Sequence, residues 1–426
     1  MKRVLAFLCF VILLAGCAEK VPSGKNVIRY SAPGFIRYNE IREDIGKDFE
    51  KDNPGMRTYY EPITGAAYFE KIQTQIAGGT EPDVFFMRDF ELPIFVSKGA
   101  LLSLDQFIQD DKDFKANDIH RILIDSYSMD GKVYGLPGSF TTGVIFYNKD
   151  LFAQAGINPP LASLSWNQIL DLAKKLTVRE KLSQGDQVNE VVKQFGLVLE
   201  YYDWITFIWQ NGGKIFTPDK KRCIISSGKA VTAINFLKSL FSKYRVMPSG
   251  ADLQQSEAYQ LFMSGRAAMF TGGRWYTTIF NDIKEFKWGI FPFFHQARKA
   301  TRLDSHAWVI SKRTKNPKLA WEFLKYLTSK EGNWKMVEVG DSVPTHKSNI
   351  ERFLKMNPEN KVYTDSLSFS YTVDKVMSPY IPWRQMQRII NEEFDKFIYG
   401  KVGAQKTLKN IEDRINSTIN ENLKEM

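Results

Sequence analysis

The chain has 426 residues, of which 43% are hydrophobic and 14% aromatic, enough to form one large or two medium hydrophobic cores. Its formal net charge is +10, but the lysines are scattered along the sequence and form no basic stripe. This distribution indicates a solvated surface, and we expect no nucleic-acid partner.

The first seventeen residues have the pattern of a bacterial export signal. Residues 1–3 carry two positive charges, and 4–15 is an apolar run of about twelve residues, too short for a membrane span of roughly 20. Leu14-Ala15-Gly16-Cys17 then matches a lipoprotein signal, in which the cysteine receives the lipid. The alternative is an ordinary secretory signal with an incidental cysteine. We expect a signal peptide over 1–16 and an acyl anchor of the palmitate type on Cys17, on the outer side of the cytoplasmic membrane.

The cysteine count excludes a disulfide framework in the mature chain. Cys9 lies in the signal and Cys17 would carry lipid, so Cys223 has no partner. The fold must therefore be held by its hydrophobic core.

Strand-like runs and helical patterns alternate from residue 26 onward, which predicts an α/β fold. Polar or glycine-rich turns at 53–55 and 78–79 end the first two helices. The polar window 179–190 is predicted to be a surface loop or an insertion. We expect strands over 26–30, 57–60 and 82–86, and helices over 35–51 and 66–77.

A second domain is predicted to begin after residue 143. Small polar residues at 139–142 lead into a strand over 144–147, after which Asn148 caps a helix that stops at Gly156. Ser165 is expected to cap the next helix. Further along, we expect a strand over 195–199, a strand ending at 272–273 and an amphipathic helix over 383–397.

Six short motifs carry a resemblance to a known family. In chain order they occupy 76–84, 130–137, 147–156, 173–177, 262–269 and 320–329. In this order, and behind a lipoprotein signal, they resemble the family 1 bacterial extracellular solute-binding proteins, which capture substrates for sugar-type ABC importers. The likeness covers most of the mature chain.

The resemblance implies a two-lobe, periplasmic-binding-protein-like α/β clamshell, in which each lobe is a central sheet flanked by helices. It places crossings between the lobes near 139–142, 290–293 and 328–331. The N-terminal lobe would hold 26–140 and 292–328, and the C-terminal lobe 143–290 and 331–426. A sugar or oligosaccharide would be held between the lobes and delivered to permease subunits. The resemblance further implies a monomer without catalytic residues, cofactor or metal.

A sugar site needs flat aromatic surfaces for C–H faces and planar polar groups for hydroxyls. Core or interdomain packing is the alternative role for Trp275, Trp383 and His306, and a surface charge is the alternative for Arg88. The expected ligand contacts, from strand ends and from the family pattern, are Arg88, Asp89, Thr141, Thr142, Glu200, Tyr202, Trp204, Gly273, Arg274, Trp275, His306, Trp383 and Arg384.

The chain also departs from the family pattern, and these departures leave the sugar's identity open. The segment 304–308, with His306, replaces a glycine-rich stretch, and the loop before Ser165 is longer than usual. The first loop, 31–35, lacks the usual tryptophan, which leaves Phe35 or Arg37 as substitutes.

Two other classes of function fit parts of the sequence. A glycosidase would also show aromatics and carboxylates, but no catalytic motif with known spacing is present and the four histidines lie far apart. A binding protein for an anionic solute, such as a uronate, a sugar phosphate or a polyol phosphate, would use Arg88, Arg274 and Arg384, because guanidinium groups suit carboxylate and phosphate.

Overall fold

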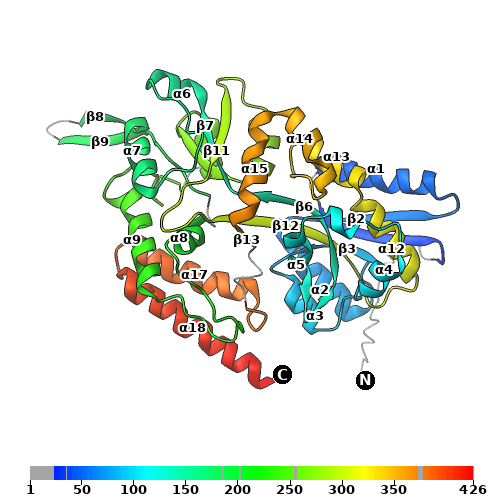
Figure 1. Cartoon of the computed structure of the whole chain (residues 1–426). Coiled ribbons are helices and arrows are strands. Elements are labelled where there is room, and N and C mark those ends of the chain that lie inside the picture. The colour runs from blue at the N-terminus through cyan, green and yellow to red at the C-terminus, as the bar shows by residue number, and fades with distance from the viewer. Residues whose placement is uncertain are drawn as a thin grey trace, which may run out of the picture.

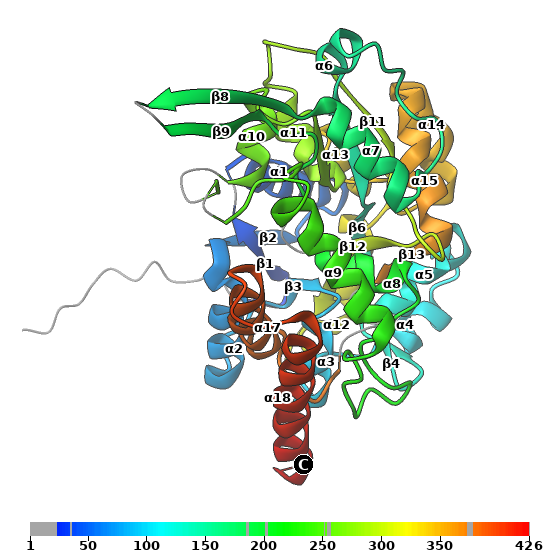
Figure 2. The same cartoon turned by 90° about the vertical axis from the view of Figure 1, so that its left-hand side faces the viewer.

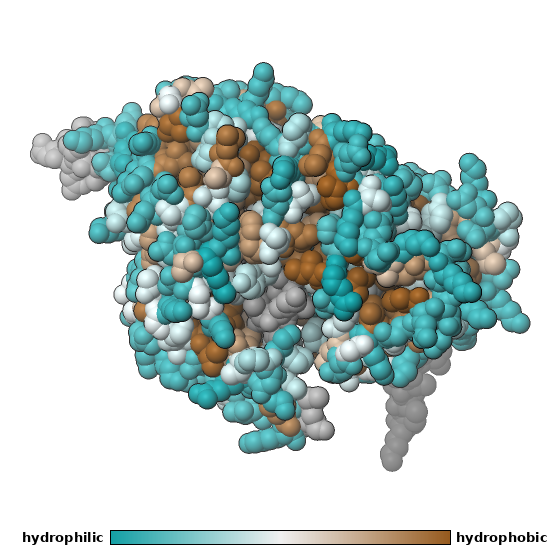
Figure 3. All heavy atoms as spheres, in the orientation of Figure 1, coloured by the Kyte–Doolittle hydropathy of each residue, from teal (hydrophilic) through white to brown (hydrophobic). Residues whose placement is uncertain are grey.

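The computed structural model describes residues 24–34, 36–184, 187–200, 203–250, 252–253, 257–372 and 378–425. Helices and strands alternate along the chain and form two halves, which lie side by side in Figure 1. Within the described residues, no helix is both long and apolar enough to cross a membrane. Hydrophilic side chains cover most of the face shown in Figure 3.

The larger sheet has six strands among these residues and lies in one half of the molecule. Its order is β13, β12, β3, β1, β2, with β6 also paired to β12. β1 runs parallel to β2 and β3, whereas β12 runs antiparallel to β3 and β6. The strands are β1 (Val27–Gly34), β2 (Arg57–Thr64), β3 (Val84–Arg88), β6 (Gly135–Thr142), β12 (Thr301–Ile310) and β13 (Ser370–Thr372).

Helices cover the larger sheet and share one apolar core with it. Phe49, Ile72, Phe95 and Phe323 come from four helices and lie in a single buried cluster with strand residues such as Val84. These helices are α1 (Ile36–Asp52), α2 (Tyr68–Gly78), α3 (Leu92–Ser97) and α12 (Pro317–Leu327).

The smaller sheet lies in the other half. β7 (Val144–Asn148) lies between β10 (Met269–Gly272) and β11 (Trp288–Pro292) and is antiparallel to both. A second buried cluster joins this sheet to the helices around it. They are α6 (Lys149–Gln154), α7 (Trp166–Leu176), α8 (Trp204–Gln210), α9 (Gly228–Ser242), α17 (Trp383–Ile398) and α18 (Ala404–Glu425).

The remaining elements are short. The helices are α4 (Asp105–Asp110), α5 (Arg121–Ser126), α10 (Ala258–Met263), α11 (Thr277–Phe280), α13 (Lys330–Glu338), α14 (Ile350–Met356) and α15 (Lys361–Ser366). β4 (Ser128–Met129) pairs with β5 (Lys132–Val133). Single 3-10 turns are η1 (Gly65–Ala67), η2 (Ala116–Asp118), η4 (Arg274–Tyr276), η5 (Lys347–Asn349), η6 (Pro358–Asn360) and η7 (Leu367–Phe369).

The predicted helix caps and the predicted helix stop at Gly156 are confirmed. Such features depend on hydrogen bonds and backbone conformation within a few residues. Asn148 caps α6, its side chain accepting from the backbone N–H groups of Asp150 and Leu151. Ser165 forms a capping box with Gln168 at the start of α7. Gly156 follows α6 with φ of 67°, a left-handed conformation that glycine adopts without steric cost.

Two local predictions need correction. The polar window 179–190 is not a loop: it lies in a hairpin of β8 (Val178–Gln184) and β9 (Gln187–Gln194), which pair with each other and project from the body in Figure 2. The segment 195–199 forms no continuous strand and makes only isolated bridges, Val198 to Phe270 of β10 and Phe195 to Ala267 just before β10.

Three connections among the described residues lead from one half to the other, and β13 later adds a short strand to the larger sheet before the chain reaches α17. β6 passes to β7 through Gly143, where an added Cβ would lie 2.6 Å from Thr301 Oγ1, so the close approach of β12 requires glycine. The second connection lies between Pro292 and Thr301, later than the expected 290–293, because β11 pairs with β7 as far as Pro292. The third leads from α12 to α13 through 328–329. The lobe boundaries themselves stay a prediction.

Candidate functional site

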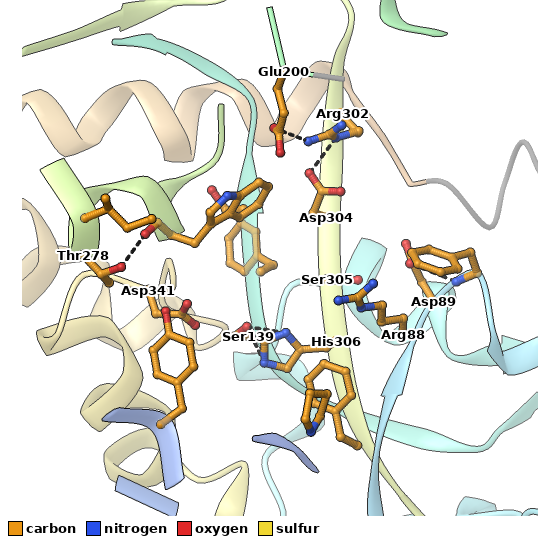
Figure 4. Close-up of a pocket in the computed structure, with 18 of the residues that line it drawn as sticks. Arg88, Asp89, Ser139, Glu200, Thr278, Arg302, Asp304, Ser305, His306 and Asp341 are labelled. Atoms are coloured by element: carbon orange, nitrogen blue, oxygen red, sulfur yellow. Dashed lines mark hydrogen bonds and ion pairs between the residues drawn. The ribbon is translucent and has the colours of Figure 1, made fainter. Parts of the chain in front are cut away.

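A cavity of about 780 Å³ lies between the two halves, and both halves line it. One wall comes from the end of β3, the second half of β6 and the first half of β12. The other wall comes from the start of α8, from η4 with α11, and from the start of α17. Figure 4 shows side chains from several of these elements pointing into the same space. A molecule bound here would touch both halves.

Aromatic rings line both walls of the cavity. Trp275 in η4 and Trp204 at the start of α8 lie on the wall of the smaller sheet. Trp383, the first residue of α17, meets Phe90 of the opposite wall, with ring centroids 5.2 Å apart. All four rings are half-buried, so each presents apolar surface to a bound molecule.

Arg302, near the start of β12, is held by carboxylates and is almost fully buried (Figure 4). Its Nη2 lies 2.8 Å from Glu200 Oε2, its Nε 2.8 Å from Asp304 Oδ2, and its Nη1 3.8 Å from Asp203 Oδ1. Asp203 also accepts a hydrogen bond from the hydroxyl of Thr271. Charge-assisted bonds of this kind fix Glu200 and Asp304 on the cavity wall.

The carboxyl group of Glu200 titrates far above the usual range. Burial raises its pKa to about 7, because the charged form loses its water; Asp203 acts in the same direction and Arg302 opposes the shift. Its Oε1 also accepts a bond of 3.3 Å from the Tyr276 hydroxyl. Near neutral pH the group is therefore divided between a form that only accepts hydrogen bonds and a form that also donates one.

His306 lines the cavity and lies next to Ser139 (Figure 4). Ser139 Oγ is 2.9 Å from its Nδ1 and 2.7 Å from its Nε2, and the Phe86 ring centroid is 4.6 Å from the imidazole. Burial lowers the pKa of His306 well below its ordinary value, and Arg42 and Arg88 add to the shift. The imidazole is therefore neutral at physiological pH and can both donate and accept.

A second set of polar side chains consists of Tyr38 and Arg42 from α1 together with Asp341. Arg42 is buried, and its Nη1 donates to Pro33 O at 2.7 Å and to Tyr60 Oη at 3.2 Å. The Tyr38 hydroxyl bonds to Asp341, whose pKa is raised by burial, with Tyr38 and Arg42 opposing the shift. Tyr38, Arg42 and Asp341 all line the cavity.

The end of β3 contributes the predicted pair Arg88 and Asp89. Asp89 is buried, and its Oδ1 accepts from the backbone N–H of Phe90 at 2.9 Å. Arg88 is exposed, with its guanidinium carbon 5.6 Å from the centroid of the Phe90 ring. Both line the cavity.

The structure brings together eight of the predicted contacts and places four others outside the lining. Those in the lining are Arg88, Asp89, Thr141, Glu200, Trp204, Trp275, His306 and Trp383. Those outside it are Thr142, Gly273, Arg274 and Arg384. Tyr202 lies outside the described residues, as do Phe35 and the proposed lipidation site Cys17.

Strand and turn geometry corrects two of the four. Successive side chains of a strand face opposite ways, so Thr141 lines the cavity whereas the Thr142 hydroxyl donates to Tyr363 O at 3.0 Å. Arg274 points away from the cavity that the adjacent Trp275 lines, and its guanidinium donates to backbone carbonyls behind the wall.

The other two have structural roles close to the cavity. An added Cβ on Gly273 would collide with the Trp275 indole, so this glycine makes room for the tryptophan. Arg384 extends outward from α17 to Glu70 of α2, at 2.6 Å.

Sequence reasoning missed several charged and polar residues of the lining. Arg302 and Asp304 lie four and two residues before His306 on one strand, so strand alternation from His306 points to them. Tyr38 and Arg42 are four residues apart on α1 and hence share a face. Asp341 lies in the connection after α13, where no local pattern identifies it.

Two α/β halves joined by three connections, with a cavity between them, define a periplasmic-binding-protein-like fold. An ABC substrate-binding protein from Listeria monocytogenes, solved in complex with cycloalternan, has the same fold, with a TM-score of 0.80 at 29% identity over 92% of this chain and 99% of that one. The family model described as bacterial extracellular solute-binding protein matches residues 32–334. The chain therefore belongs to this family, whose members are binding proteins and not enzymes.

Two relatives match this chain over most of its length. A putative binding protein of Brucella abortus is 26% identical over 94% of this chain and 93% of its own. The arabinooligosaccharide-binding protein of Bacillus subtilis is 29% identical over 79% of each chain.

Proposed function

We propose that the protein captures an uncharged oligosaccharide in this cavity and delivers it, as a monomer and without chemical change, to the permease of an ABC importer. The observation that carries the proposal is one cavity in which both walls combine half-buried aromatic rings with hydrogen-bonding side chains. Aromatic faces suit the C–H faces of sugar rings, and carboxylate or imidazole groups suit their hydroxyls.

The names of similar proteins support the sugar class. The Bacillus subtilis relative is an arabinooligosaccharide-binding protein, and the Listeria structure holds cycloalternan. Both ligands are oligosaccharides.

The size of the cavity favours more than one sugar unit. A hexose unit has about twelve heavy atoms, each taking at most the roughly 30 Å³ of a water molecule, so one unit fills no more than about 360 Å³. A cavity of about 780 Å³ therefore has room for at least two units.

The charge of the lining disfavours the anionic alternative. Arg302 is held by carboxylates, Arg42 donates to a carbonyl and a tyrosine hydroxyl, and Arg274 and Arg384 lie outside the lining. A uronate or a phosphate would thus meet more acidic than basic side chains, and Arg88 is the one exposed guanidinium group of the described lining. The described lining includes five carboxyl groups and three guanidinium groups, namely Asp89, Glu200, Asp282, Asp304 and Asp341, and Arg42, Arg88 and Arg302.

Capture would proceed by closure of the two halves. In the described structure, Phe90 meets Trp383 and Glu70 pairs with Arg384, and each contact joins an element of one half to an element of the other. A ligand that touches both walls binds the closed form better than the open form, and only such a difference in affinity can shift the equilibrium.

Calorimetry with a sugar panel tests the proposed ligand class. The panel holds maltotriose, arabinotriose and cycloalternan on one side, and glucuronate, glucose 6-phosphate and glycerol 3-phosphate on the other. We expect at least one neutral oligosaccharide to bind with a Kd of about 1 µM or tighter. Tighter binding of an anionic compound, weakened by salt, would establish the alternative function instead.

We further propose that Cys17 anchors the protein to the outer side of the membrane, on the strength of the Leu14 to Cys17 pattern. The wild type should then partition into the detergent phase of a Triton X-114 extraction. Cys17→Ser should enter the aqueous phase or stay uncleaved at this site. Equal partitioning and processing of the two proteins would rule out the anchor.

A further inference from the structure

Arg274 was expected to touch the ligand, but it is buried on the far side of its turn. It is 4% exposed, and its Nη1 donates to Val337 O at 2.9 Å and to Ser342 O at 2.8 Å. Its guanidinium carbon lies 4.9 Å from the centroid of the Phe353 ring. No ion pair joins Arg274 to a carboxylate among the described residues, so backbone carbonyls and an aromatic face replace its water.

These contacts join three separate segments of the cavity wall. Val337 and Ser342 flank Asp341, which lines the cavity. The backbone N–H of Arg274 donates to Thr141 Oγ1 at 2.8 Å, and Thr141 lines the cavity from β6. The next residue along the chain, Trp275, lines it from η4.

We infer that Arg274 is a positioning residue of the ligand site, which holds Trp275 and Asp341 at a fixed separation across the wall. Its effect on affinity rests on the proposed function, whereas its effect on Trp275 does not. A buried charge costs free energy, and here it links η4 to the stretch around Asp341 through Val337 and Ser342, which are 63 and 68 residues away in the sequence.

Lysine can replace only part of this arrangement. One guanidinium nitrogen donates to two carbonyls while the guanidinium carbon lies over the Phe353 ring. The lysine side chain is shorter, and its ammonium group lacks the planar shape of a guanidinium. Arg274→Lys should therefore be intermediate between the wild type and Arg274→Met.

Fluorine NMR of protein labelled with 5-fluorotryptophan tests the positioning role without any ligand. The chain has nine tryptophans, and the Trp275 resonance is assigned by its loss in Trp275→Phe. In Arg274→Met, we expect the Trp275 resonance to shift or broaden while the resonances of Trp204 and Trp383 stay in place. A general loss of stability would instead move all of these signals together.

Arg384→Met is a matched control, because Arg384 is also an arginine directly beside a tryptophan of the cavity. It should affect the Trp383 resonance and leave that of Trp275 unchanged. If folded Arg274→Met keeps the wild-type Trp275 resonance, the inference is wrong. Should Arg274→Met fail to fold, Arg274→Lys replaces it under the same criterion.

Calorimetry adds a second readout, with whichever of maltotriose, arabinotriose or cycloalternan the wild type binds most tightly. Arg274→Met should weaken binding about tenfold, and in a Trp275→Ala background the same change should cost less than about threefold. Independent, additive losses would show that Arg274 does not act through Trp275. If the wild type binds none of these sugars, the proposed ligand class fails, and the fluorine signals still decide the role of Arg274.

Discussion

At the scale of single residues, the cavity wall depends on neighbours that point in opposite directions. Trp275 lines the cavity, and Gly273 leaves room for its indole. Arg274 lies on the other side of the turn, where it donates hydrogen bonds to two backbone carbonyls. A substitution at each of these positions should therefore act on binding by a different physical route.

Trp275→Ala should remove aromatic surface from the wall. Truncation of such a contact costs about 2 kcal/mol, roughly thirtyfold in affinity, and calorimetry with the best neutral oligosaccharide of the panel measures it. The melting temperature should change little, since the indole is only half-buried. Trp288→Phe, a change outside the lining, is the control and should bind normally. Unchanged affinity in Trp275→Ala would assign the ring to packing alone.

Glu200 should make stability depend on pH. Its pKa is about 7 in the folded protein against an ordinary 4.5, so the folded state binds this proton more tightly than the unfolded chain does. Its contribution to the free energy of unfolding therefore falls as pH rises from about 4.5 to about 7. The glutamine of Glu200→Gln does not titrate, so the variant does not lose this free energy as pH rises. The difference in free energy of unfolding, variant minus wild type, should therefore increase from pH 5 to pH 7.5, by at most on the order of 3 kcal/mol.

Urea unfolding at several pH values measures this difference. Glu40→Gln, on an exposed position of α1, is the control, and its stability should follow the wild-type pH profile. Parallel profiles for Glu200→Gln and the wild type would contradict the prediction. Burial also raises the pKa of Asp203. The free energy of unfolding of Glu200→Gln should therefore still depend on pH to some extent.

At the scale of elements, the β8–β9 hairpin forms a sheet of its own, and Arg245 and Tyr244 of the body bond to Glu190 and Arg179 in it. Its strands form their ladder with each other, and its ion pairs, such as Arg179 with Glu190 and Glu180 with Lys193, are at least partly exposed. Exposed pairs contribute between zero and about 1 kcal/mol each. The hairpin also lies outside the cavity lining.

Shortening this hairpin should therefore be tolerated. Glu180 and Val191 face each other in the ladder, so replacing 181–190 with Asn-Gly leaves a two-residue turn between paired residues. We expect urea unfolding to show a loss of less than about 2 kcal/mol and calorimetry to show unchanged sugar affinity. A variant that binds sugar more weakly would show that the hairpin is coupled to the cavity.

At the scale of the whole molecule, closure should be visible as compaction. Because a bound oligosaccharide would touch both walls, small-angle scattering of residues 18–426 should give a smaller radius of gyration with saturating sugar. Trp275→Ala is the control, and it should need about thirtyfold more sugar than the wild type to reach the smaller radius. Tight binding without any change in the scattering curve would exclude closure and indicate a preformed site.

The sequence by itself determined features that depend on residues close together in the chain. The caps at Asn148 and Ser165 and the order of the strands and helices before residue 90 follow from hydrogen bonds and apolar spacing within a few residues. The family follows in the same way, from six short motifs in order. Strand ends also predicted Asp89 and Trp275 in the lining of the cavity.

Only the tertiary structure decided which neighbouring side chain faces the cavity and which distant groups meet there. Thr141 and Trp275 line it, whereas Thr142 and Arg274 beside them point away. Arg302 pairs with Glu200 from 102 residues away. The physical reason is that composition and spacing describe one segment at a time, whereas pairing of charges and direction of side chains depend on which segments the packed core brings together.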